Sequence, residues 1–586
     1  ILATVKKREK KRSFYLTPLK AIAEEKFEEF REKYTDWGLN VAITTGERSE
    51  YDANLMEYDL IIATYEKLDA LLIRNPNLIK DIGLIIVDEL QMIGDEKRGI
   101  NLEILLSKII YTTDELPQII GLSATIPNAE ELGEWLKAEV IKTEKREVEL
   151  REGIVYTGDK EIEFEGHKLK KGDFLYREFN TGNIDVERDL NIHTVSGLID
   201  ISTREQVIIF ESTRKKAENL AIEISKQLPP SSNVTEWISK IDILVESTPS
   251  TRQLKKCMLN GVAFHHAGLS PEEKRIVEEA FEKGAIRIIC STLTLGAGVN
   301  TPAKTVIIRS TQFWDGRSIK SRDYKNMAGR AGRIKYHDDF GRSVLFAETE
   351  KDFERYWQGY INLKAERVES QIRKRQDNIE SSILKLTVSG ICKNVKELIK
   401  FIENTFFGYL YYQKIDSSFK QAFEESISEQ IQELIKMGML EEVEGELKAT
   451  ELGKRCAEEM ISPHSAYIIF QALEKINEKE VINYNELIEP IIHLACCTSD
   501  ARLLYPPISK QEKMEIFGYW MDNESNYLFH LHPDDENLIL SVTKTTQMLL
   551  KWITGVPYSD LESFAPHGII RNIGENVSWI VKSIKR

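Results

Sequence analysis

The feature that most constrains the fold is a series of short, β-branched apolar runs that alternate with amphipathic helical stretches over the first two-thirds of the chain. Strands that are apolar along their whole length are buried on both faces, which is typical of a parallel sheet covered by helices. The stretch 19–30 predicts a covering helix, because its apolar positions fall on one face. The alternation predicts an α/β fold. The runs lie at residues 60–63, 84–87, 119–122, 207–210, 262–264, 286–289 and 306–308.

Two changes of pattern divide the chain, whose 586 residues correspond to about four domains of average size. Between 145 and 205 a charged extended stretch and a polar hairpin at 161–171 interrupt the strand series, and we interpret them as a linker with an insertion. After about residue 365 the strand signal nearly vanishes. A helical stretch at 381–407, a helix that ends at Gly438, a short hairpin and a further helix predict a winged helix. The predicted domains are 1–145, 146–370 with inserted hairpins, 371–460, and a mostly helical 461–586.

Composition excludes several classes of protein. Apolar residues make up 42% and charged residues 30%, which is globular and argues against a largely disordered chain. No apolar run approaches the roughly 18 residues of a membrane span, so we expect no membrane partner. The six cysteines form no C-x-x-C pair, which disfavours a disulfide framework and predicts a reducing cytoplasm. A net charge of −15 excludes a uniformly basic nucleic-acid coat but leaves room for a local basic channel.

The strongest local signal is a pair of adjacent carboxylates, Asp88 and Glu89, at the end of the apolar run 84–87. In an open parallel sheet, ligands bind beyond the carboxyl ends of the strands. A carboxylate there can hold Mg²⁺ through water, and its neighbour can orient and help deprotonate an attacking water. A solvated strand end is the competing interpretation, since Asp-Glu is a common dipeptide.

Two further segments strengthen the chemical interpretation. Small hydroxyl residues, Ser123 and Thr125, close another apolar strand, where they can couple a nucleotide site to a neighbouring domain; an ordinary turn is the alternative. The run 326–333 places Arg330 and Arg333 three residues apart on one side of a helical turn, between glycines that let the backbone come close. The planar fork of arginine suits phosphate oxygens and the charge that develops in phosphoryl transfer.

These segments occur in one order with others at 15–21, 61–67 and 292–302, and this order resembles that of the superfamily-two helicases. The Phe-His-His-Ala-Gly-Leu segment at 264–269, the Met-Ala-Gly-Arg-Ala-Gly-Arg run and the helical tail are similar to the Ski-like branch. Within that branch the chain most resembles the archaeal Hjm-type DNA repair helicases, which are related to the helicase part of polymerase theta. The resemblance covers nearly the whole chain. It implies two RecA-like parallel-sheet domains followed by a winged helix and a helical bundle domain.

The resemblance also implies a role for each matching residue. Asp88, holding Mg²⁺ through water, and Glu89 would be the metal and water-activating pair, and Arg330 and Arg333 would reach the γ-phosphate of ATP. The residues implied at the nucleotide and in its coupling to domain movement are Gln91, Ser123, Thr125, Gly298, Asn300 and Asn326. The residues implied to contact one nucleic-acid strand are Thr17, Lys20, Thr64, Thr213 and Thr294.

Three departures from the family pattern are visible. The chain contains no G-x-x-x-x-G-K-[ST] loop to cradle phosphates, and in the family this loop falls just before the segment that matches 1–7. We therefore expect a truncated record, and we expect this chain as given not to hydrolyse ATP, although the complete protein should. Gln91 stands where His is usual, and Asn326 stands where Gln is usual. Both replacements keep hydrogen-bonding capacity, so we expect tuned coupling.

A local basic stretch is the predicted nucleic-acid path. Residues 304–335 hold nine Lys or Arg against two Asp, and phosphate contacts there would make binding salt-dependent. Asp315-Gly316 within it predicts a hairpin turn. The neighbouring pair Phe313-Trp314 is a candidate strand-separating wedge, as in the resembled helicases, with aromatics facing the core as the alternative.

A predicted helix at 541–553 carries Lys544 and Trp552. The resemblance implies that a helix here presents a basic residue and an aromatic to successive bases as a ratchet, and stacking of this kind tolerates any sequence. Core packing of Trp552 against Leu549 and Val556 is an equally weighted alternative.

The leading hypothesis is a monomeric, ATP-driven DNA helicase or translocase in the cytoplasm, associated with the nucleoid. It would act on single-stranded and forked DNA in repair and replication restart, with replication and repair proteins as candidate partners. The 3′-to-5′ polarity and the forked substrate are implied by the resemblance alone. One alternative is an RNA helicase of the exosome-associated Ski-like branch, which the short span 381–460 disfavours because it has no room for a stalk insertion. The other is a catalytically silent nucleic-acid clamp, which only the missing phosphate loop supports.

Overall fold

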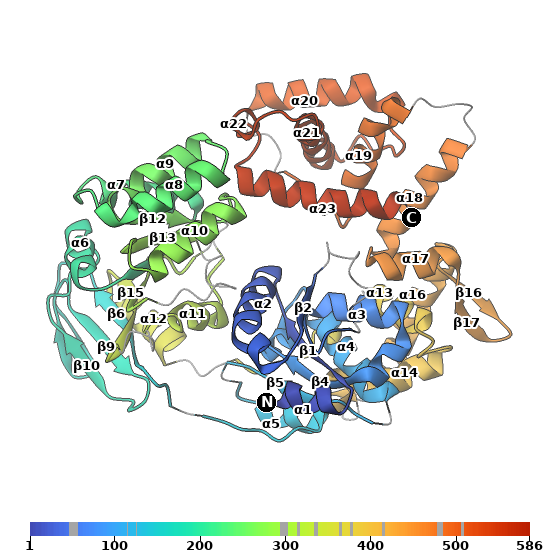
Figure 1. Cartoon of the computed structure of the whole chain (residues 1–586), viewed down its shortest axis with the longest axis horizontal. Helices are drawn as coiled ribbons and strands as arrows, with labels where there is room; N and C mark the ends of the chain where they lie inside the picture. Colours follow the sequence, from blue (N-terminus) through green and yellow to red (C-terminus); the bar gives the residue numbers. More distant parts are fainter. Residues whose placement is uncertain are drawn as a thin grey trace. The chain divides into compact units, whose positions relative to one another are not determined.

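The computed structural model describes most of the chain, in two compact units. The residues outside the description are 46–54, 56, 114, 125, 144, 293–302, 313–316, 333–337, 363–365, 375–378, 413–416, 478–483, 505–508 and 586. The first unit comprises Ile1–Val140, Arg367–Leu550 and Ile573–Arg586, and the second comprises Ile141–Glu366 and Lys551–Asn572 (Figure 1). Seven predicted site residues lie outside the described residues, so their roles stay predictions: Thr125, Thr294, Gly298, Asn300, Phe313, Trp314 and Arg333.

The first unit contains a five-stranded parallel sheet in the order β2-β3-β1-β4-β5. Every residue of β3 is buried, as the apolar run predicts for a strand covered on both faces. The strands are β1 (Arg12–Thr17), β2 (Val41–Thr44), β3 (Leu60–Thr64), β4 (Ile82–Val87) and β5 (Gln118–Gly121). The helices are α1 (Leu2–Arg8), α2 (Lys20–Tyr34), α3 (Tyr65–Arg74), α4 (Gly99–Thr112) and α5 (Ala129–Leu136).

The predicted covering helix at 19–30 is confirmed as α2, which continues to Tyr34. Ala23 is fully buried, and Phe27 and Phe30 pack against a small core formed with residues of β1, β2 and β3. The apolar face that the sequence shows is therefore the face that covers the sheet.

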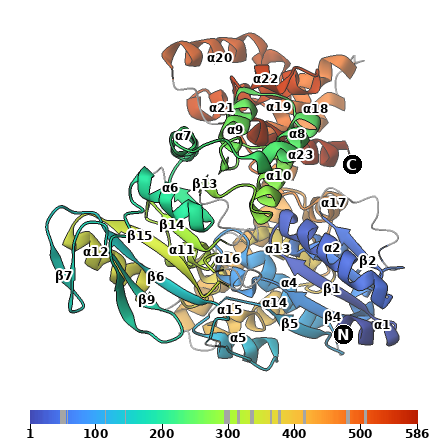
Figure 2. The same cartoon turned by 60° about the vertical axis from the view of Figure 1, so that its left-hand side comes forward.

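The second unit contains an eight-stranded sheet in the order β10-β9-β6-β15-β14-β11-β13-β12, in which β9 and β10 add an antiparallel edge (Figure 2). Its first strand, β6, pairs in parallel with β15, so part of the predicted linker region belongs to the sheet. The sheet strands are β6 (Glu149–Tyr156), β9 (Phe174–Glu178), β10 (Ile184–Glu187), β11 (Val207–Glu211), β12 (Val262–His265), β13 (Ile288–Thr292), β14 (Thr305–Ile308) and β15 (Phe340–Ala347).

The predicted polar hairpin is confirmed as β7 (Ile162–Phe164) and β8 (His167–Leu169). The helices of this unit are α6 (Val195–Arg204), α7 (Arg214–Ser225), α8 (Thr235–Leu244), α9 (Pro249–Met258), α10 (Pro271–Glu282), α11 (Ser321–Ala328), α12 (Glu350–Tyr356) and α22 (Tyr558–Leu561).

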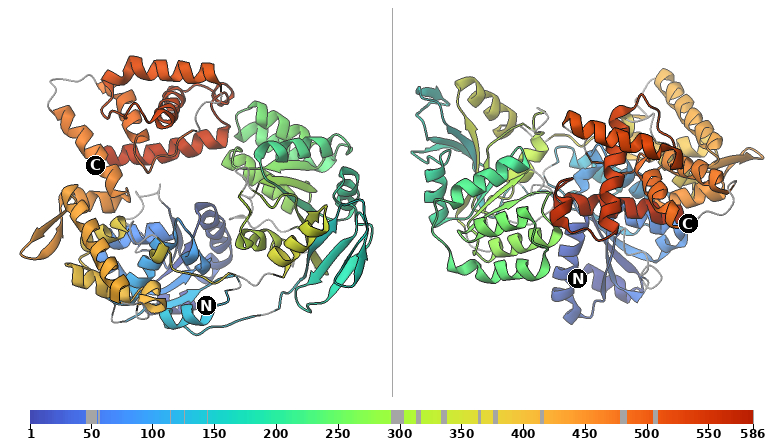
Figure 3. Two further views of the ribbon diagram at one scale, coloured as in Figure 1. Left: turned by 180° about the vertical axis from the view of Figure 1, so that it is seen from behind. Right: turned by 90° about the horizontal axis from the view of Figure 1, so that it is seen from above.

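The predicted winged-helix outline follows the second sheet in the chain and belongs to the first unit. Its hairpin, which projects from the neighbouring helices (Figure 3), turns at Glu444 and Gly445, both with positive φ, as a two-residue hairpin loop requires. The elements are α13 (Glu380–Val388), α14 (Val395–Glu403), α15 (Phe406–Leu410), α16 (Ser417–Lys436), β16 (Leu440–Val443), β17 (Glu446–Ala449) and α17 (Glu451–Glu459).

Buried polar contacts join this segment to the first sheet's helices. Lys108 Nζ lies 2.7 Å from one carboxylate oxygen of Asp69, and Lys385 Nζ of α13 lies 3.4 Å from the other. The indole N–H of Trp135 donates to the Asn404 carbonyl at 3.0 Å. The buried charges of Lys108, Lys385 and Asp69 are therefore paired with one another, as a stable interface requires.

The last part of the chain is helical. Its helices are α18 (Pro463–Asn477), α19 (Ile488–Cys496), α20 (Lys510–Asn523), α21 (Glu536–Ile553) and α23 (His567–Lys585). Within the described residues, the helices are too short or too polar to cross a membrane. All six cysteines are buried free thiols.

Candidate functional site

The carboxylate pair follows β4 directly and is held by the neighbouring strand and helix. The Asp88 amide donates to the Leu16 carbonyl of β1 at 2.9 Å. One Asp88 carboxylate oxygen accepts from the Tyr15 hydroxyl at 3.0 Å, and the Asp88 carbonyl accepts from the Tyr65 hydroxyl. Glu89 has a left-handed backbone (φ 53°), and its amide donates to the other Asp88 carboxylate oxygen at 3.0 Å. Both acidic side chains are half-buried at the carboxyl edge of the sheet.

The two phenols that hold Asp88 remain donors. Burial raises the pKa of Tyr15, and the Asp88 carboxylate raises it further. Burial likewise raises the pKa of Tyr65, with Asp88 as the next cause. Each protonated phenol donates one hydrogen bond, from Tyr15 to the Asp88 carboxylate and from Tyr65 to the Asp88 main-chain carbonyl.

A side-chain relay links the carboxylate pair to the loop after β5. The Gln91 amide nitrogen donates to a Glu89 carboxylate oxygen. The Gln91 amide oxygen accepts from the Ser123 hydroxyl at 2.7 Å. A side-chain amide can bind both partners, because its nitrogen donates to the carboxylate and its oxygen accepts from the hydroxyl. The structure thus brings Asp88, Glu89, Gln91 and Ser123 together at one edge of the sheet.

The three strand-contact candidates of the first sheet lie at adjacent strand ends. Thr17 and Thr64 are register partners of β1 and β3. The Thr17 hydroxyl donates to the Leu19 carbonyl at 3.1 Å, and the Thr64 hydroxyl accepts from the Lys67 amide as the N-cap of α3. Both threonines are buried, whereas Lys20, at the start of α2, is exposed.

The arginine segment of the second unit follows α11. Arg330 is half-buried, and the carbonyls of its neighbours Gly329 and Ala331 both accept from one guanidinium nitrogen of Arg146, at 3.2 and 3.1 Å. The Arg146 backbone is itself held by the side-chain amide of Asn180, at 2.8 and 3.1 Å. Asn326 lies half-buried on α11. The loop that presents Arg330 is therefore clamped through its main chain.

The remaining candidates of this unit fall into two kinds. Thr213 caps α7 just after β11 and accepts from the Lys216 amide at 3.2 Å. His265 and His266 point to different glutamates, with Nε2 2.7 Å from Glu278 and 3.1 Å from Glu218 respectively. In the part of the chain that is described, no group of three metal-ligating residues occurs.

The two ratchet candidates on α21 have protein partners. Lys544 of the first unit lies 2.7 Å from Glu512, and its side chain is 12% exposed. Trp552 of the second unit is half-buried and donates its indole N–H to the Tyr558 hydroxyl at 2.9 Å. A phosphate contact by Lys544 would have to compete with Glu512, so this part of the site stays a prediction.

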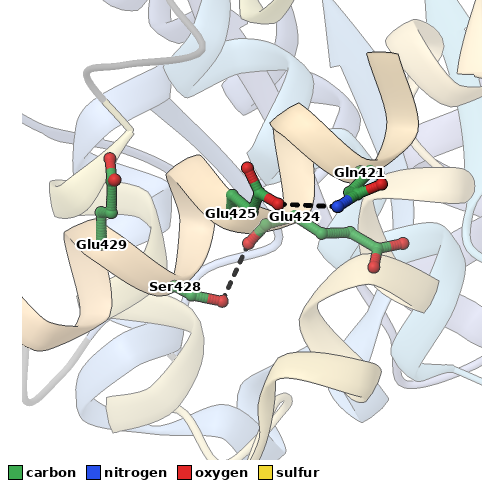
Figure 4. Close-up of a pocket in the computed structure, with 5 residues that line it drawn as sticks. All are labelled: Gln421, Glu424, Glu425, Ser428 and Glu429. Atoms are coloured by element: carbon green, nitrogen blue, oxygen red, sulfur yellow. Dashed lines mark hydrogen bonds between the residues drawn. The ribbon is translucent and has the colours of Figure 1, made fainter. Parts of the chain in front are cut away.

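A surface hollow on α16 does not belong to the site (Figure 4). The Gln421 side chain donates to Glu425 at 2.9 Å, and the Ser428 hydroxyl donates to the Glu424 main-chain carbonyl at 2.9 Å. Glu429 adds a third carboxylate to the lining. Such a surface repels phosphate, because like charges disfavour each other.

Four residues that hold the site escaped the sequence analysis, among them Arg98, which donates to Glu66 next to Tyr65. Tyr15 and Tyr65 fall inside segments that were recognised as helicase-like, but their hydroxyl partners follow only from the strand order. Arg98 and Arg146 lie outside the recognised motifs. Both arginines are half-buried and bind main-chain carbonyls of distant segments, and no local pattern in the sequence marks such partners.

Comparisons with known families agree with this geometry. Residues 1–132 match the DEAD/DEAH box helicase family, residues 191–335 match the helicase conserved C-terminal domain, and residues 490–586 match domain 4 of archaeal helicases. Together with the two sheets, these matches define the class: an ATP-dependent helicase with two RecA-like domains and a helical C-terminal region.

Curated relatives narrow the class to a family. The chain is 34% identical over 582 residues to the "ATP-dependent DNA helicase Hel308" of Pyrococcus horikoshii, which covers 98% of this chain and 76% of the relative. Identity to the protein of the same name from Pyrococcus abyssi is 32%, covering 98% of this chain and 75% of the relative, and to that from Methanocella arvoryzae 32%, covering 97% and 75%. The chain belongs to the Hel308 family of helicases.

Proposed function

We propose that the full-length protein is an ATP-dependent DNA helicase that translocates 3′-to-5′ and unwinds branched or forked DNA in repair and replication restart. The relatives' names supply the nucleic-acid type and the use of ATP. The single observation that carries the proposal is the continuous contact from Asp88 and Glu89 through Gln91 to Ser123. The arrangement joins a hydrolytic pair to a coupling element.

Asp88 suits a water-mediated contact to Mg²⁺. Its carboxylate is half-buried at a strand end, where one oxygen accepts from the Glu89 N–H and the other from the Tyr15 hydroxyl, and a carboxylate oxygen can accept a further hydrogen bond from water. Mg²⁺ prefers one or two carboxylates together with waters and substrate phosphates. When bound, the ion would neutralise charge on the phosphate oxygens of ATP. Glu89 would orient the attacking water and take its proton, and Arg330 with Arg333 would stabilise the γ-phosphate charge.

The remaining predicted residues would serve coupling and strand contact. Gln91, Ser123, Thr125, Gly298, Asn300 and Asn326 would sense the nucleotide. Thr17, Lys20, Thr64, Thr213 and Thr294 would contact one strand, Phe313 and Trp314 would separate the duplex, and Lys544 with Trp552 would ratchet on bases. In this proposal the protein acts as a monomer in the cytoplasm, near the nucleoid, with the domain boundaries 1–145, 146–370, 371–460 and 461–586.

Glu89→Gln in the full-length protein tests the proposal. We expect kcat for ATP hydrolysis to fall by about 100-fold or more, because the amide cannot accept the proton of the attacking water. Binding of a fluorescent oligothymidylate should persist. The matched control is Glu28→Gln, which alters an exposed carboxylate on α2 of the same unit. Hydrolysis by Glu89→Gln at the wild-type rate would contradict the assignment.

Two further measurements separate the alternatives. Unwinding of matched forked DNA and RNA duplexes distinguishes a DNA helicase from an RNA helicase, and we expect the DNA fork to be preferred. Reading the genomic sequence upstream of Ile1 distinguishes an enzyme from a silent clamp. A Gly-Lys-Thr or Gly-Lys-Ser run within about ten residues supports the enzyme, because this loop cradles the phosphates.

A further inference from the structure

Arg98 lies outside the helicase-like motifs and links the segments that follow strands β1 and β3. It is the N-cap residue of α4, and its guanidinium reaches back across the sheet edge. Nε and one terminal nitrogen donate to the two carboxylate oxygens of Glu66, at 2.8 and 2.7 Å. The other terminal nitrogen donates to the Pro18 carbonyl. The guanidinium carbon also lies 5.9 Å from the centroid of the Tyr65 ring.

The two partners of Arg98 lie in the loops proposed to contact a nucleic-acid strand. Pro18 lies directly after Thr17, at the end of β1. Glu66 lies in the first turn of α3, two residues after Thr64. A guanidinium can hold a carboxylate with two parallel hydrogen bonds and still donate to a third acceptor, which fixes direction as well as distance. A lysine has no such fork.

The same cluster reaches the nucleotide side of the sheet. Tyr65, beneath the Arg98 guanidinium and adjacent to Glu66, donates its hydroxyl to the Asp88 carbonyl. A displacement of the first turn of α3 would therefore act directly on the backbone of the carboxylate pair. The contacts run without a gap from the Pro18 loop to Asp88 within one unit.

We propose that Arg98 is a positioning residue that transmits strand binding at the β1 and β3 loops to the carboxylate pair, and so mediates the stimulation of ATP hydrolysis by single-stranded DNA. The inference rests on the proposed helicase function. Arg98 and Glu66 are 26% and 29% exposed in their side chains, and partly exposed ion pairs contribute little to folding. We therefore expect the Arg98 guanidinium to fix the positions of Glu66 and Pro18 more than to stabilise the fold.

The experiment compares full-length wild-type protein with Arg98→Gln, Arg98→Lys and Glu66→Gln. The readout is the ratio of the ATP hydrolysis rate with saturating oligothymidylate to the rate without it. We expect Arg98→Gln to lower this ratio by about tenfold, the size of a typical coupling between two sites. Arg98→Lys should recover only part of it, because an ammonium group cannot hold both Glu66 oxygens and the Pro18 carbonyl.

The control is Arg31→Gln, which removes a positive charge from an exposed pair on α2 of the same unit and should keep the wild-type ratio. A wild-type ratio in Arg98→Gln, in a wild-type protein that is stimulated, overturns the inference and leaves the proposed function intact. Absence of stimulation in the wild type overturns both. If Arg98→Gln does not fold, Glu66→Gln decides, since a folded variant with the wild-type ratio overturns the inference equally.

Discussion

The acidic segment of the first unit and the arginine segment of the second are held in different ways. Asp88 and Glu89 are fixed by side chains from several elements, among them Tyr15 of β1 and Tyr65 of α3. The loop of Arg330 is held by Arg146, because one guanidinium nitrogen donates to the carbonyls of both Gly329 and Ala331. Side chains of several elements thus hold the acidic segment, whereas main-chain hydrogen bonds to Ala303 and one guanidinium nitrogen of Arg146 hold the arginine segment.

The difference teaches where a single substitution should matter. Support from several side chains is redundant, because the loss of one hydrogen bond leaves the others in place. Support through main-chain carbonyls is also insensitive to the sequence of the held loop, since any residue supplies a carbonyl. A substitution outside the motif, in the clamp itself, should therefore be the more damaging one in the second unit.

Among the residues that hold the two segments, the largest effect is expected for Arg146→Met, which keeps the length of the side chain but removes its donors. We expect kcat for ATP hydrolysis by the full-length protein to fall by about 100-fold, because small displacements of a catalytic group have costs of that size. Arg146→Lys should lose less, since an ammonium group retains a donor. Steady-state kinetics with and without oligothymidylate provide the measurement.

The control for Arg146 is Arg204→Met, in an exposed pair on α6 of the same unit. It should match the wild type in kcat, and both variants should bind oligothymidylate normally. If Arg146→Met hydrolyses ATP like the control, the arginine segment does not depend on its clamp and the contrast between the two units disappears.

A smaller effect is expected for Gln91→Ala, which breaks the relay between Glu89 and Ser123 while Tyr15 and Tyr65 still hold Asp88. Base pairs unwound per ATP hydrolysed should fall by about five- to tenfold, the range of a modest coupling. Gln91→His, which restores the residue usual in the resembled family, should unwind like the wild type. An equal loss in both variants would show that the relay needs the amide itself.

Local patterns in the sequence predicted much of this architecture. The wing between Leu440 and Ala449 was readable because alternating strands flank a Glu-Gly turn, and both turn residues adopt positive φ. The sequence predicted that Asp88 and Ser123 each follow an apolar strand, and the structure places both at one edge because parallel strands share a carboxyl edge.

Other features depend on contacts that no local pattern records. The helical stretch predicted at 381–407 is divided among three helices, because Gly390 takes a positive φ (69°) and Asn394 and Thr405 cap new helices with their side chains. Arg98 and Arg146 were missed because their partners include main-chain carbonyls, which every sequence has. The identity of such a partner is decided by the fold alone.

The smallest effect concerns Glu103, a fully buried carboxyl on α4 that accepts from the Ser370 hydroxyl at 2.7 Å and the Phe407 amide at 2.8 Å. Burial raises the pKa of Glu103 from 4.5 to about 7, against the opposing effect of these hydrogen bonds. The folded state then holds a proton that the unfolded state has released. The stabilisation by this group is complete below pH 4.5 and is lost as the pH rises through 7.

Glu103→Gln removes this titration, so its melting temperature should depend less on pH than that of the wild type. Between pH 5 and pH 8 the melting temperature of the wild type should fall by about 2–4 °C relative to that of Glu103→Gln. Calorimetry on the transition of the first unit measures both temperatures. Glu32→Gln, at an exposed position on α2, is the matched control and should follow the wild type. If the melting temperatures of Glu103→Gln and wild type change equally with pH, Glu103 is ionised in the folded protein. The hydrogen bonds from Ser370 and Phe407 would then be enough to hold a buried charge.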